Sequence, residues 1–250
     1  MKSIVVTDIE LRSRWYANRR DKLTVPVGAV LTPAAKDFIR ENNITLIYGS
    51  EECDSGFSVT PIPTENGKNV FVDAITGEKL YEKRENYTHL QGNLLVSKSH
   101  PRIHLRGKLD SLMAEIIEAQ LAADAEGDRE TVQALDEILS FTRKILASEV
   151  NEKPLGEITL LGMNSGELRY KSQNVREAFG IDHPLPSYKQ GAVCAALNSL
   201  RTCVREAELA AVEAFPEGRM DIIEALNRLS SAVYIVYCRK LGGCYGGMTR

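Results

Sequence analysis

From about residue 99 to residue 241, apolar residues recur at intervals of three and four, and the connections between these segments are short. This spacing is typical of amphipathic helices, because residues three and four apart share one face of a helix. We expect five helices: a first one that ends near Gly127, then helices over residues 130–150, 167–179, 190–214 and 220–241. Helices with short connections pack as antiparallel neighbours, so the expected fold class is mainly α, a five-helix antiparallel bundle.

Strand and helix signals are mixed before the bundle, in KLTVPVGAVLTPAAKDFIRENNITLIY (residues 22–48). Apolar residues alternate over 23–27, which is typical of a strand. Thr32 stands directly before Pro33, an arrangement that predicts a helix N-cap followed by a first-turn proline. A helix of about ten residues should follow, and then a strand over 44–48. The pattern predicts a small βαβ-like unit.

The stretch NVFVDAITGEKLYEKR (residues 69–84) has the pattern of a β-hairpin that turns around Thr76 and Gly77, whereas residues 49–67 have the composition of a loop. We therefore expect two domains. Residues 1–90 should form a small N-terminal α/β unit, and residues 91–250 should form the helical-bundle domain.

Composition excludes several classes of protein. A net charge of −3 and a pI near 5.9 give no reason to expect a nucleic-acid or membrane-surface protein. No apolar run approaches the ~18 residues of a membrane span, and the first residues do not read as a secretory signal. The five cysteines are odd in number and form no C-x-x-C pair, which favours a reducing cytosol over a disulfide framework.

Polar residues form a stripe along the helix predicted over 190–214. At 100° per residue, Asn198, Arg201, Arg205 and Glu208 fall within an arc of about 80°. Arginines next to a core need anions, and guanidinium groups match phosphate oxygens two at a time. The stripe therefore favours a ligand that carries phosphate.

Two neighbouring helices carry polar residues that could join this stripe. Asp110 lies between the apolar Leu109 and Leu112, and Asn227 lies in line with Ser230 and Tyr234 on the last helix. A single aspartate can neutralise only one of the two arginines, so positive charge would remain for a ligand.

Ordinary explanations exist for each residue taken alone. Arg201 and Arg205 could point into solvent and pair with Glu206 or Glu208, Asn227 could be a polar core residue, and Asp110 could cap a helix. Only the complete set is unusual.

Three segments together resemble a known family. RTCVREAE, from Arg201, resembles the Arg-x-x-x-Arg-x-x-Glu motif of ATP:corrinoid (cobalamin) adenosyltransferases of the propanediol type, and NRLSSAVYIVY, from Asn227, resembles their Asn-Arg-Leu-Ser segment. Residues 87–116 resemble the stretch from the family's phosphate loop to the aspartate of its first helix. Residues 31–48 point to the ethanolamine-utilisation subgroup.

The resemblance implies transfer of the 5′-deoxyadenosyl group of ATP to cob(I)alamin, which yields adenosylcobalamin, the cofactor of ethanolamine ammonia-lyase. It implies catalytic roles for Arg201, Asp110 and Arg205, with Arg201 paired to Asp110. The ATP-binding residues that it implies are Thr88, His89, Lys98, Arg102, Arg205, Glu208 and Asn227.

The family excludes the lower axial ligand of cobalt with an apolar side chain from the loop before the arginine helix. Here that loop is FGIDHPLPSYKQG, and its candidates for contact with the corrinoid are Phe179, Leu185 and Tyr188. The residues alone do not choose among the three.

The chain departs from the family pattern at two places. The phosphate loop is only THLQGN, where backbone N–H groups could still cradle phosphates. Ethanolamine-type enzymes often carry a histidine with adjacent cysteines, tied to a divalent metal, but here only Cys53 precedes the bundle, and Pro101 separates His100 from His104. We therefore expect ATP, Mg²⁺ and cobalamin without a structural transition metal.

The resemblance also implies a setting and partners. The family builds its sites between bundle subunits, so a homo-oligomer is expected, with a trimer favoured. Ethanolamine ammonia-lyase or microcompartment proteins are the protein partners that it suggests, and the location is the cytoplasm or a bacterial microcompartment within it. The alternative from another class is a non-enzymatic assembly or scaffold protein of such a microcompartment.

Overall fold

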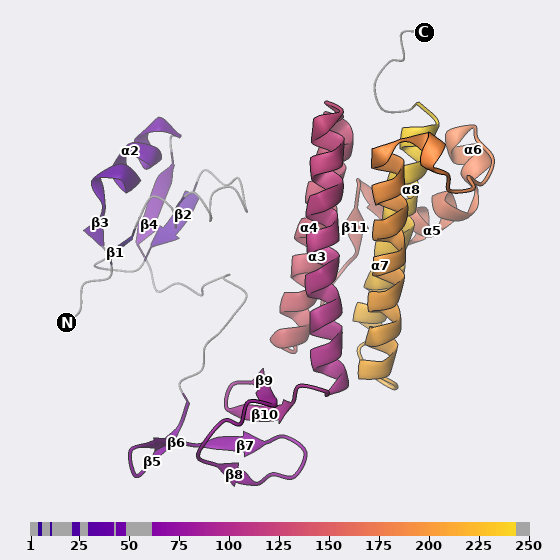
Figure 1. The fold of residues 1–250 in the computed structure, drawn as a ribbon. Coiled ribbons are helices and arrows are strands. Elements are labelled where there is room, and N and C mark those ends of the chain that lie inside the picture. Colours follow the sequence, from indigo (N-terminus) through magenta and orange to yellow (C-terminus); the bar gives the residue numbers. More distant parts are fainter. Residues whose placement is uncertain are drawn as a thin grey trace. The chain divides into compact units, whose positions relative to one another are not determined.

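The computed structural model describes residues 5–6, 11, 22–25, 30–42, 44–48 and 62–243. The chain divides into two compact units, Met1–Ser58 and Val59–Arg250 (Figure 1). The sequence placed the boundary at residue 90, whereas the structure groups the strands of residues 64–97 with the helices that follow them.

Among its described residues, the N-terminal unit has two pairs of parallel strands and helix α2. Strands β2 (Lys22–Val25) and β4 (Thr45–Tyr48) pair with each other, as do β1 (Val5–Val6) and β3 (Val30–Leu31). Helix α2 (Pro33–Glu41) begins where it was predicted, because the Thr32 hydroxyl accepts a hydrogen bond from the Ala35 N–H at 3.2 Å. Strand β2 precedes α2 in the chain and β4 follows it, and the two strands pair in parallel, which confirms the βαβ-like unit. The predicted strand position Val27 and the cysteine Cys53 lie outside the described residues.

The second unit begins with short strands. These are β5 (Thr64–Glu65), β6 (Lys68–Asn69), β7 (Phe71–Asp73), β8 (Lys79–Leu80), β9 (Tyr87–Gln91) and β10 (Leu94–Ser97), of which the last four form a sheet in the order β8-β7-β10-β9. The predicted hairpin around Thr76 and Gly77 is confirmed, and the Asp73 carboxylate accepts the N–H groups of Ile75 and Thr76 inside its turn.

The segment compared with a phosphate loop adopts a different structure. Thr88 and His89 pair with Val96 and Leu95 in the antiparallel β9–β10 ladder. The backbone of these two residues is therefore part of a hairpin, whose turn lies at Gly92 and Asn93.

Six α-helices follow in the described residues. They are α3 (Pro101–Ala125), α4 (Arg129–Val150), α5 (Ser165–Gln173), α6 (Val175–Phe179), α7 (Ala192–Ala214) and α8 (Met220–Leu241), with the small hairpin β11 (Thr159–Leu160) and β12 (Met163–Asn164) before α5. The long helices α3, α4, α7 and α8 pack side by side (Figure 1) around one apolar core of leucine, isoleucine, valine and alanine side chains. The mainly α bundle with a small N-terminal α/β unit is thus confirmed, and none of the described helices is long and apolar enough to cross a membrane.

The single helix predicted over 167–179 is wrong in one respect, because it is interrupted at Asn174. That residue has φ −112° and ψ 55°, which are not helical angles, and its side-chain amide donates to the Tyr170 carbonyl at 2.8 Å. A short polar side chain that bonds the preceding turn competes with the helical hydrogen bonds. The chain therefore restarts as α6.

A network of charged residues, which we call the base network, joins the start of α3 to the end of α4. Glu149 is fully buried and accepts from Arg102 Nε at 2.6 Å and from Arg106 Nε at 2.5 Å. Arg106 also donates to the carbonyls of His89 and Leu90 in β9, at 3.2 and 2.8 Å. One arginine therefore ties the sheet to the bundle.

Arg219 extends the base network to α8. It donates to Asp221 Oδ1 at 3.0 Å and to the Ser148 hydroxyl at 2.6 Å. The guanidinium groups of Arg102 and Arg219 lie 5.6 and 5.9 Å from the centre of the Phe215 ring. The hydrogen bond from Arg219 holds the pKa of Asp221 below its ordinary value. Opposite charges are matched at this end of the bundle.

Candidate functional site

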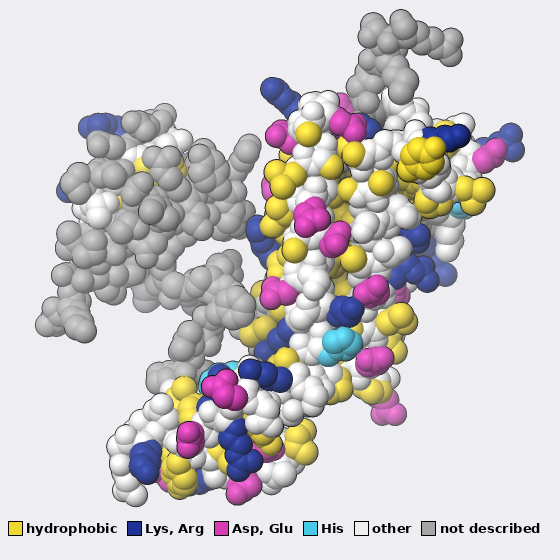
Figure 2. Space-filling view, in the orientation of Figure 1, with side chains coloured by type: hydrophobic (Ala, Val, Ile, Leu, Met, Phe, Trp, Pro, Cys, Tyr) yellow, Lys and Arg dark blue, Asp and Glu magenta, His cyan; other side chains and the backbone are white. Residues whose placement is uncertain are grey.

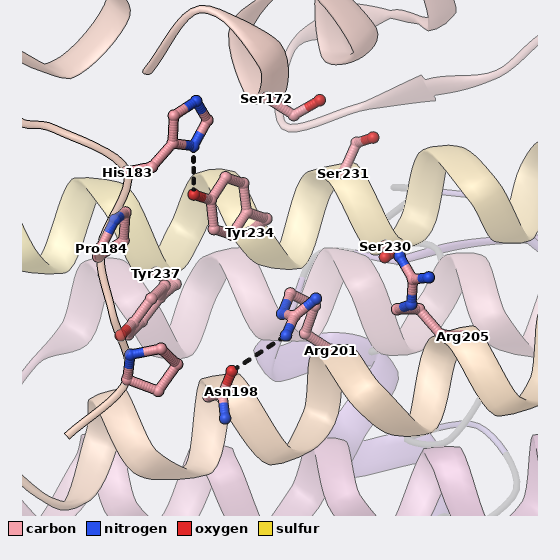
Figure 3. A pocket seen from close by; sticks show the side chains of 11 residues that line it. Ser172, His183, Pro184, Asn198, Arg201, Arg205, Ser230, Ser231, Tyr234 and Tyr237 are labelled. Atoms are coloured by element: carbon pink, nitrogen blue, oxygen red, sulfur yellow. Dashed lines mark hydrogen bonds between the residues drawn. The ribbon is translucent and has the colours of Figure 1, made fainter. Parts of the chain in front are cut away.

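A pocket of about 340 Å³ lies between α7, α8 and the loop that joins α6 to α7 (Figure 3). This volume is in the range of small-molecule sites. Its lining is largely polar: Ser172, His183, Pro184, Pro186, Asn198, Arg201, Arg205, Ser230, Ser231, Tyr234 and Tyr237.

Two arginines of the predicted stripe line this pocket. Arg201 and Arg205 extend from α7 toward α8 (Figure 3), and Arg201 donates to the Asn198 side-chain oxygen at 3.3 Å. In the part of the chain that the structure describes, neither arginine forms a salt bridge with a carboxylate. Two positive charges on one wall can therefore bind an anion with several oxygens.

The acids that could have neutralised these arginines have other partners. Glu206 accepts from Lys108 at 2.7 Å, and this hydrogen bond holds the pKa of its carboxyl group below the ordinary value. Glu208 accepts from the Asn227 side-chain amide at 2.8 Å. The structure thus brings Glu208 and Asn227 together across α7 and α8.

Asp110 does not pair with Arg201 within one chain. It is exposed on α3. Hydrogen bonds join α3 to α7 on either side of it, from Lys108 to Glu206 and from Ser199 to Glu115, so Asp110 lies at the same height along the bundle as the two arginines. The preceding residue, Leu109, faces the core, and a rotation of 100° per residue turns Asp110 away from it. Within the single chain, the structure therefore does not show the predicted contact between Asp110 and Arg201.

Of the seven predicted ATP ligands, Arg205 lines the pocket and the other six do not: Thr88, His89, Lys98, Arg102, Glu208 and Asn227. Lys98 is exposed, and the His89 ring nitrogen Nδ1 lies 3.0 Å from the Gly92 carbonyl oxygen. Arg102 donates to Glu149 and, at 2.7 Å, to Glu152. The structure therefore assigns Arg102 to the base network and not to the pocket.

The three corrinoid candidates differ in their surroundings. Phe179 packs against the bundle core. Leu185 and Tyr188 are each 85% exposed. Leu185 stands between Pro184 and Pro186, which both line the pocket.

The sequence interpretation did not assign His183, Tyr234 or Tyr237 to the site. His183 Nδ1 lies 2.9 Å from the Tyr234 hydroxyl, and the two rings stack with 12° between their planes. Burial raises the pKa of Tyr234 to about 12, so its hydroxyl is protonated at neutral pH. The signal for Tyr234 was its alignment with Asn227 on α8, whereas nothing in the sequence placed His183 beside it.

Comparisons with known proteins show the family of the chain. The model of the cobalamin adenosyltransferase family matches residues 82–240, which is more than half of the chain. The corrinoid adenosyltransferase EutT of Salmonella typhimurium is 28% identical over 244 residues, covering 92% of this chain and 90% of that protein. EutT of Escherichia coli is 27% identical over the same shares.

Two further matches concern the bundle. The corrinoid adenosyltransferase PduO of Salmonella typhimurium is 31% identical over 144 residues, or 56% of this chain and 42% of that protein. The fold is shared with a variant of a PduO-type ATP:corrinoid adenosyltransferase from Lactobacillus reuteri, solved with cobalamin and ATP. That match has a TM-score of 0.52 at 16% identity and covers 65% of this chain and 92% of the other. By the extent of its match to the family model, the chain belongs to the cobalamin adenosyltransferase family.

Proposed function

We propose that this protein transfers the 5′-deoxyadenosyl group of ATP to cob(I)alamin. The observation that carries the proposal is that Arg201 and Arg205 both line one pocket of the helical bundle. Neither forms a salt bridge with a carboxylate among the described residues, and the bundle lies within the segment that matches the family model. The names of the EutT and PduO relatives and the ATP and cobalamin of the Lactobacillus reuteri complex support it.

In the proposed reaction, the electron pair of Co(I) forms the bond from cobalt to C5′ of ATP. The bond from C5′ to the triphosphate oxygen breaks, and the electron pair leaves with the triphosphate. Co(I) is itself the nucleophile, so no protein base is required. The protein contributes by aligning the two substrates and stabilising charge on the leaving group.

The guanidinium groups of Arg201 and Arg205 would bind the triphosphate, and the Glu208–Asn227 pair would contact the nucleotide beside them. Mg²⁺ would travel with ATP and offset part of its charge. Three of the predicted ATP ligands outside the pocket are the exposed Lys98 and the β9 residues Thr88 and His89. In the described structure, none of their side chains forms a salt bridge with Glu149, whose partners are Arg102 and Arg106. Lys98, Thr88 and His89 would reach a pocket on a neighbouring subunit.

A homotrimer is the assembly that we propose. Asp110 is exposed at the axial level of Arg201, and it could meet the Arg201 of a neighbour. Figure 2 shows hydrophobic side chains among charged ones on the face formed by α3 and α7. Exposed apolar residues there include Ile117, Leu121, Leu209 and Val212. Such residues favour contact with another protein surface.

The product would supply ethanolamine ammonia-lyase, in the cytoplasm or in a microcompartment. This finer assignment rests on the EutT relatives. A scaffold protein without activity is the alternative, and it would bind neither ATP nor corrinoid.

The test uses full-length protein that has been treated with a chelator and then supplied with Mg²⁺, ATP and chemically reduced cobalamin. Adenosylcobalamin should accumulate, as measured by its light-sensitive absorption spectrum, and omission of ATP should abolish it. Absence of both product and ATP binding would contradict the proposal. Activity that returns only with iron or zinc would leave the reaction standing and contradict the expectation that no transition metal is needed.

A further inference from the structure

Helix α8 holds both ends of the loop segment His183–Gln190 that lines the pocket. At one end, the Tyr234 hydroxyl lies 2.9 Å from His183 Nδ1. At the other, Tyr237, which is 2% exposed, donates its hydroxyl to Gln190 Oε1 at 2.6 Å. Burial raises the pKa of Tyr237, so this hydroxyl keeps its proton at neutral pH.

The Gln190 side chain connects Tyr237 to the backbone of the loop. Its Oε1 also accepts from the Ser187 N–H at 3.1 Å, and its Nε2 donates to the Leu185 carbonyl at 3.0 Å. One amide therefore bonds to residues on both sides of Pro186. Proline restricts φ, so the arch Pro184–Leu185–Pro186 is constrained both by its own rings and by this amide.

We infer that Gln190, held by the Tyr237 hydroxyl, is a positioning residue for the corrinoid side of the site. The inference rests on the proposed function. Pro184 and Pro186 line the pocket that the arginines line from α7, so the arch fixes where Leu185 stands relative to a bound corrinoid. Phe179 cannot take this place without leaving the bundle core, against which it packs.

In the described structure, neither Gln190 nor Tyr237 forms a hydrogen bond with Arg201 or Arg205, although the Tyr237 ring also lines the pocket. The Gln190 amide and the Tyr237 hydroxyl act on the corrinoid through the arch. Loss of the amide should therefore weaken use of the corrinoid and leave use of ATP unchanged. Loss of the Tyr237 hydroxyl should act in the same direction but more weakly, because Gln190 would keep its two bonds to the loop.

The experiment measures KM for cob(I)alamin and KM for ATP in the full-length protein. The variants are Tyr237→Phe, Gln190→Met and the double variant, and Tyr81→Phe is the control. Tyr81 also loses a hydroxyl that donates to a side chain, Glu65 at 3.4 Å, but it lies in the exposed part of the sheet unit. Thermal melting of each variant is recorded beside the kinetics.

We expect the KM for cob(I)alamin to rise about threefold to tenfold in Gln190→Met, the effect of losing net one or two hydrogen bonds. The KM for ATP should stay within about twofold. The double variant should be no worse than Gln190→Met alone, because Tyr237 acts through Gln190. Tyr81→Phe should match the wild type in both constants.

Three results would overturn the inference: an unchanged KM for cob(I)alamin in Gln190→Met, an equal rise in both KM values, or additive effects in the double variant. Wild-type protein that makes no adenosylcobalamin would instead contradict the proposed function and remove the basis of the inference. Active wild type with unaffected variants would contradict the positioning role alone.

Discussion

The bundle uses arginine in two opposite ways. In the base network, Arg102 and Arg106 share the buried carboxylate of Glu149, and Arg219 pairs with Asp221. In the pocket, Arg201 and Arg205 line one wall and form no salt bridge with a carboxylate among the described residues. Buried charges that are matched by opposite charges hold elements together, whereas unmatched charges in a cavity leave binding capacity for a ligand. The difference separates structural from functional arginines.

The largest effect should come from breaking the base network at Glu149. Glu149→Ala leaves Arg102 and Arg106 without their shared carboxylate, although both guanidinium groups keep some exposure. The free energy of unfolding should fall by about 3 kcal/mol, the lower end of the range for a broken buried pair. Urea denaturation measures it. Glu65→Ala, which breaks the exposed Lys79 pair, should leave the midpoint nearly unchanged, and equal losses in the two variants would contradict the distinction.

Removal of a pocket arginine should reduce activity and leave the free energy of unfolding nearly unchanged. Arg205→Ala should lower kcat/KM for ATP about 30-fold, as expected when a charged hydrogen bond worth about 2 kcal/mol is lost. Stability should change by less than about 0.5 kcal/mol, since the side chain is exposed. Arg143→Ala, an exposed arginine in the middle of α4, is the matched control. Full activity in Arg205→Ala would return this residue to the class of ordinary solvated arginines.

A smaller effect should reveal the contact of Asp110 with Arg201 between chains. In a double-mutant cycle of Asp110→Asn and Arg201→Gln, we expect a coupling free energy of about 1 kcal/mol in activity. Burial of the pair in one chain would have made the coupling larger, but the exposure of Asp110 excludes that arrangement. The coupling should disappear on dilution to a monomer, as followed by sedimentation. Additive effects at every concentration would mean that the two residues never touch.

The smallest effect concerns pH. His100 caps α3 by accepting from the Arg102 N–H at 3.2 Å. Burial and the charges of Arg102 and Arg106 hold its pKa below the ordinary value. As pH falls below about 6.5, the unfolded chain therefore takes up the proton before the folded chain does, and stability decreases.

The variant His100→Asn keeps a capping side chain but does not titrate, so its unfolding free energy should vary less between pH 7 and pH 5. His104→Asn, at an exposed position four residues on, is the comparison variant. If both variants retain the same slope as the wild type, His100 does not contribute to it.

Much of the bundle could be predicted because its signals are local. The apolar spacing predicted helices over residues 130–150 and 220–241, and the structure has helices over Arg129–Val150 and Met220–Leu241. The prediction began α7 at residue 190, whereas residues 188–190 form a 3₁₀ turn capped by Ser187. The break at Asn174 depends on one side chain and leaves the apolar spacing unchanged.

The site was less predictable because it depends on contacts between distant segments. Arg201 and Arg205 could be found from spacing on a single helix. The pairing of residues 88–89 with 95–96, the outward turn of Asp110 and the approach of His183 to Tyr234 are decided by packing. Arg102 illustrates the limit most clearly, since its acidic partners lie 47 and 50 residues later in the chain.

The hydrogen bond from Arg201 to Asn198 has a consequence for the entropy of binding. A free arginine side chain has about 2 kcal/mol of rotamer entropy to lose when a ligand orders it. Asn198, one turn earlier on α7, restricts the Arg201 guanidinium before any ligand arrives. Part of that loss therefore occurs during folding, so an incoming anion meets a side chain with less disorder to remove, and Asn198 contributes to affinity without having to touch the ligand.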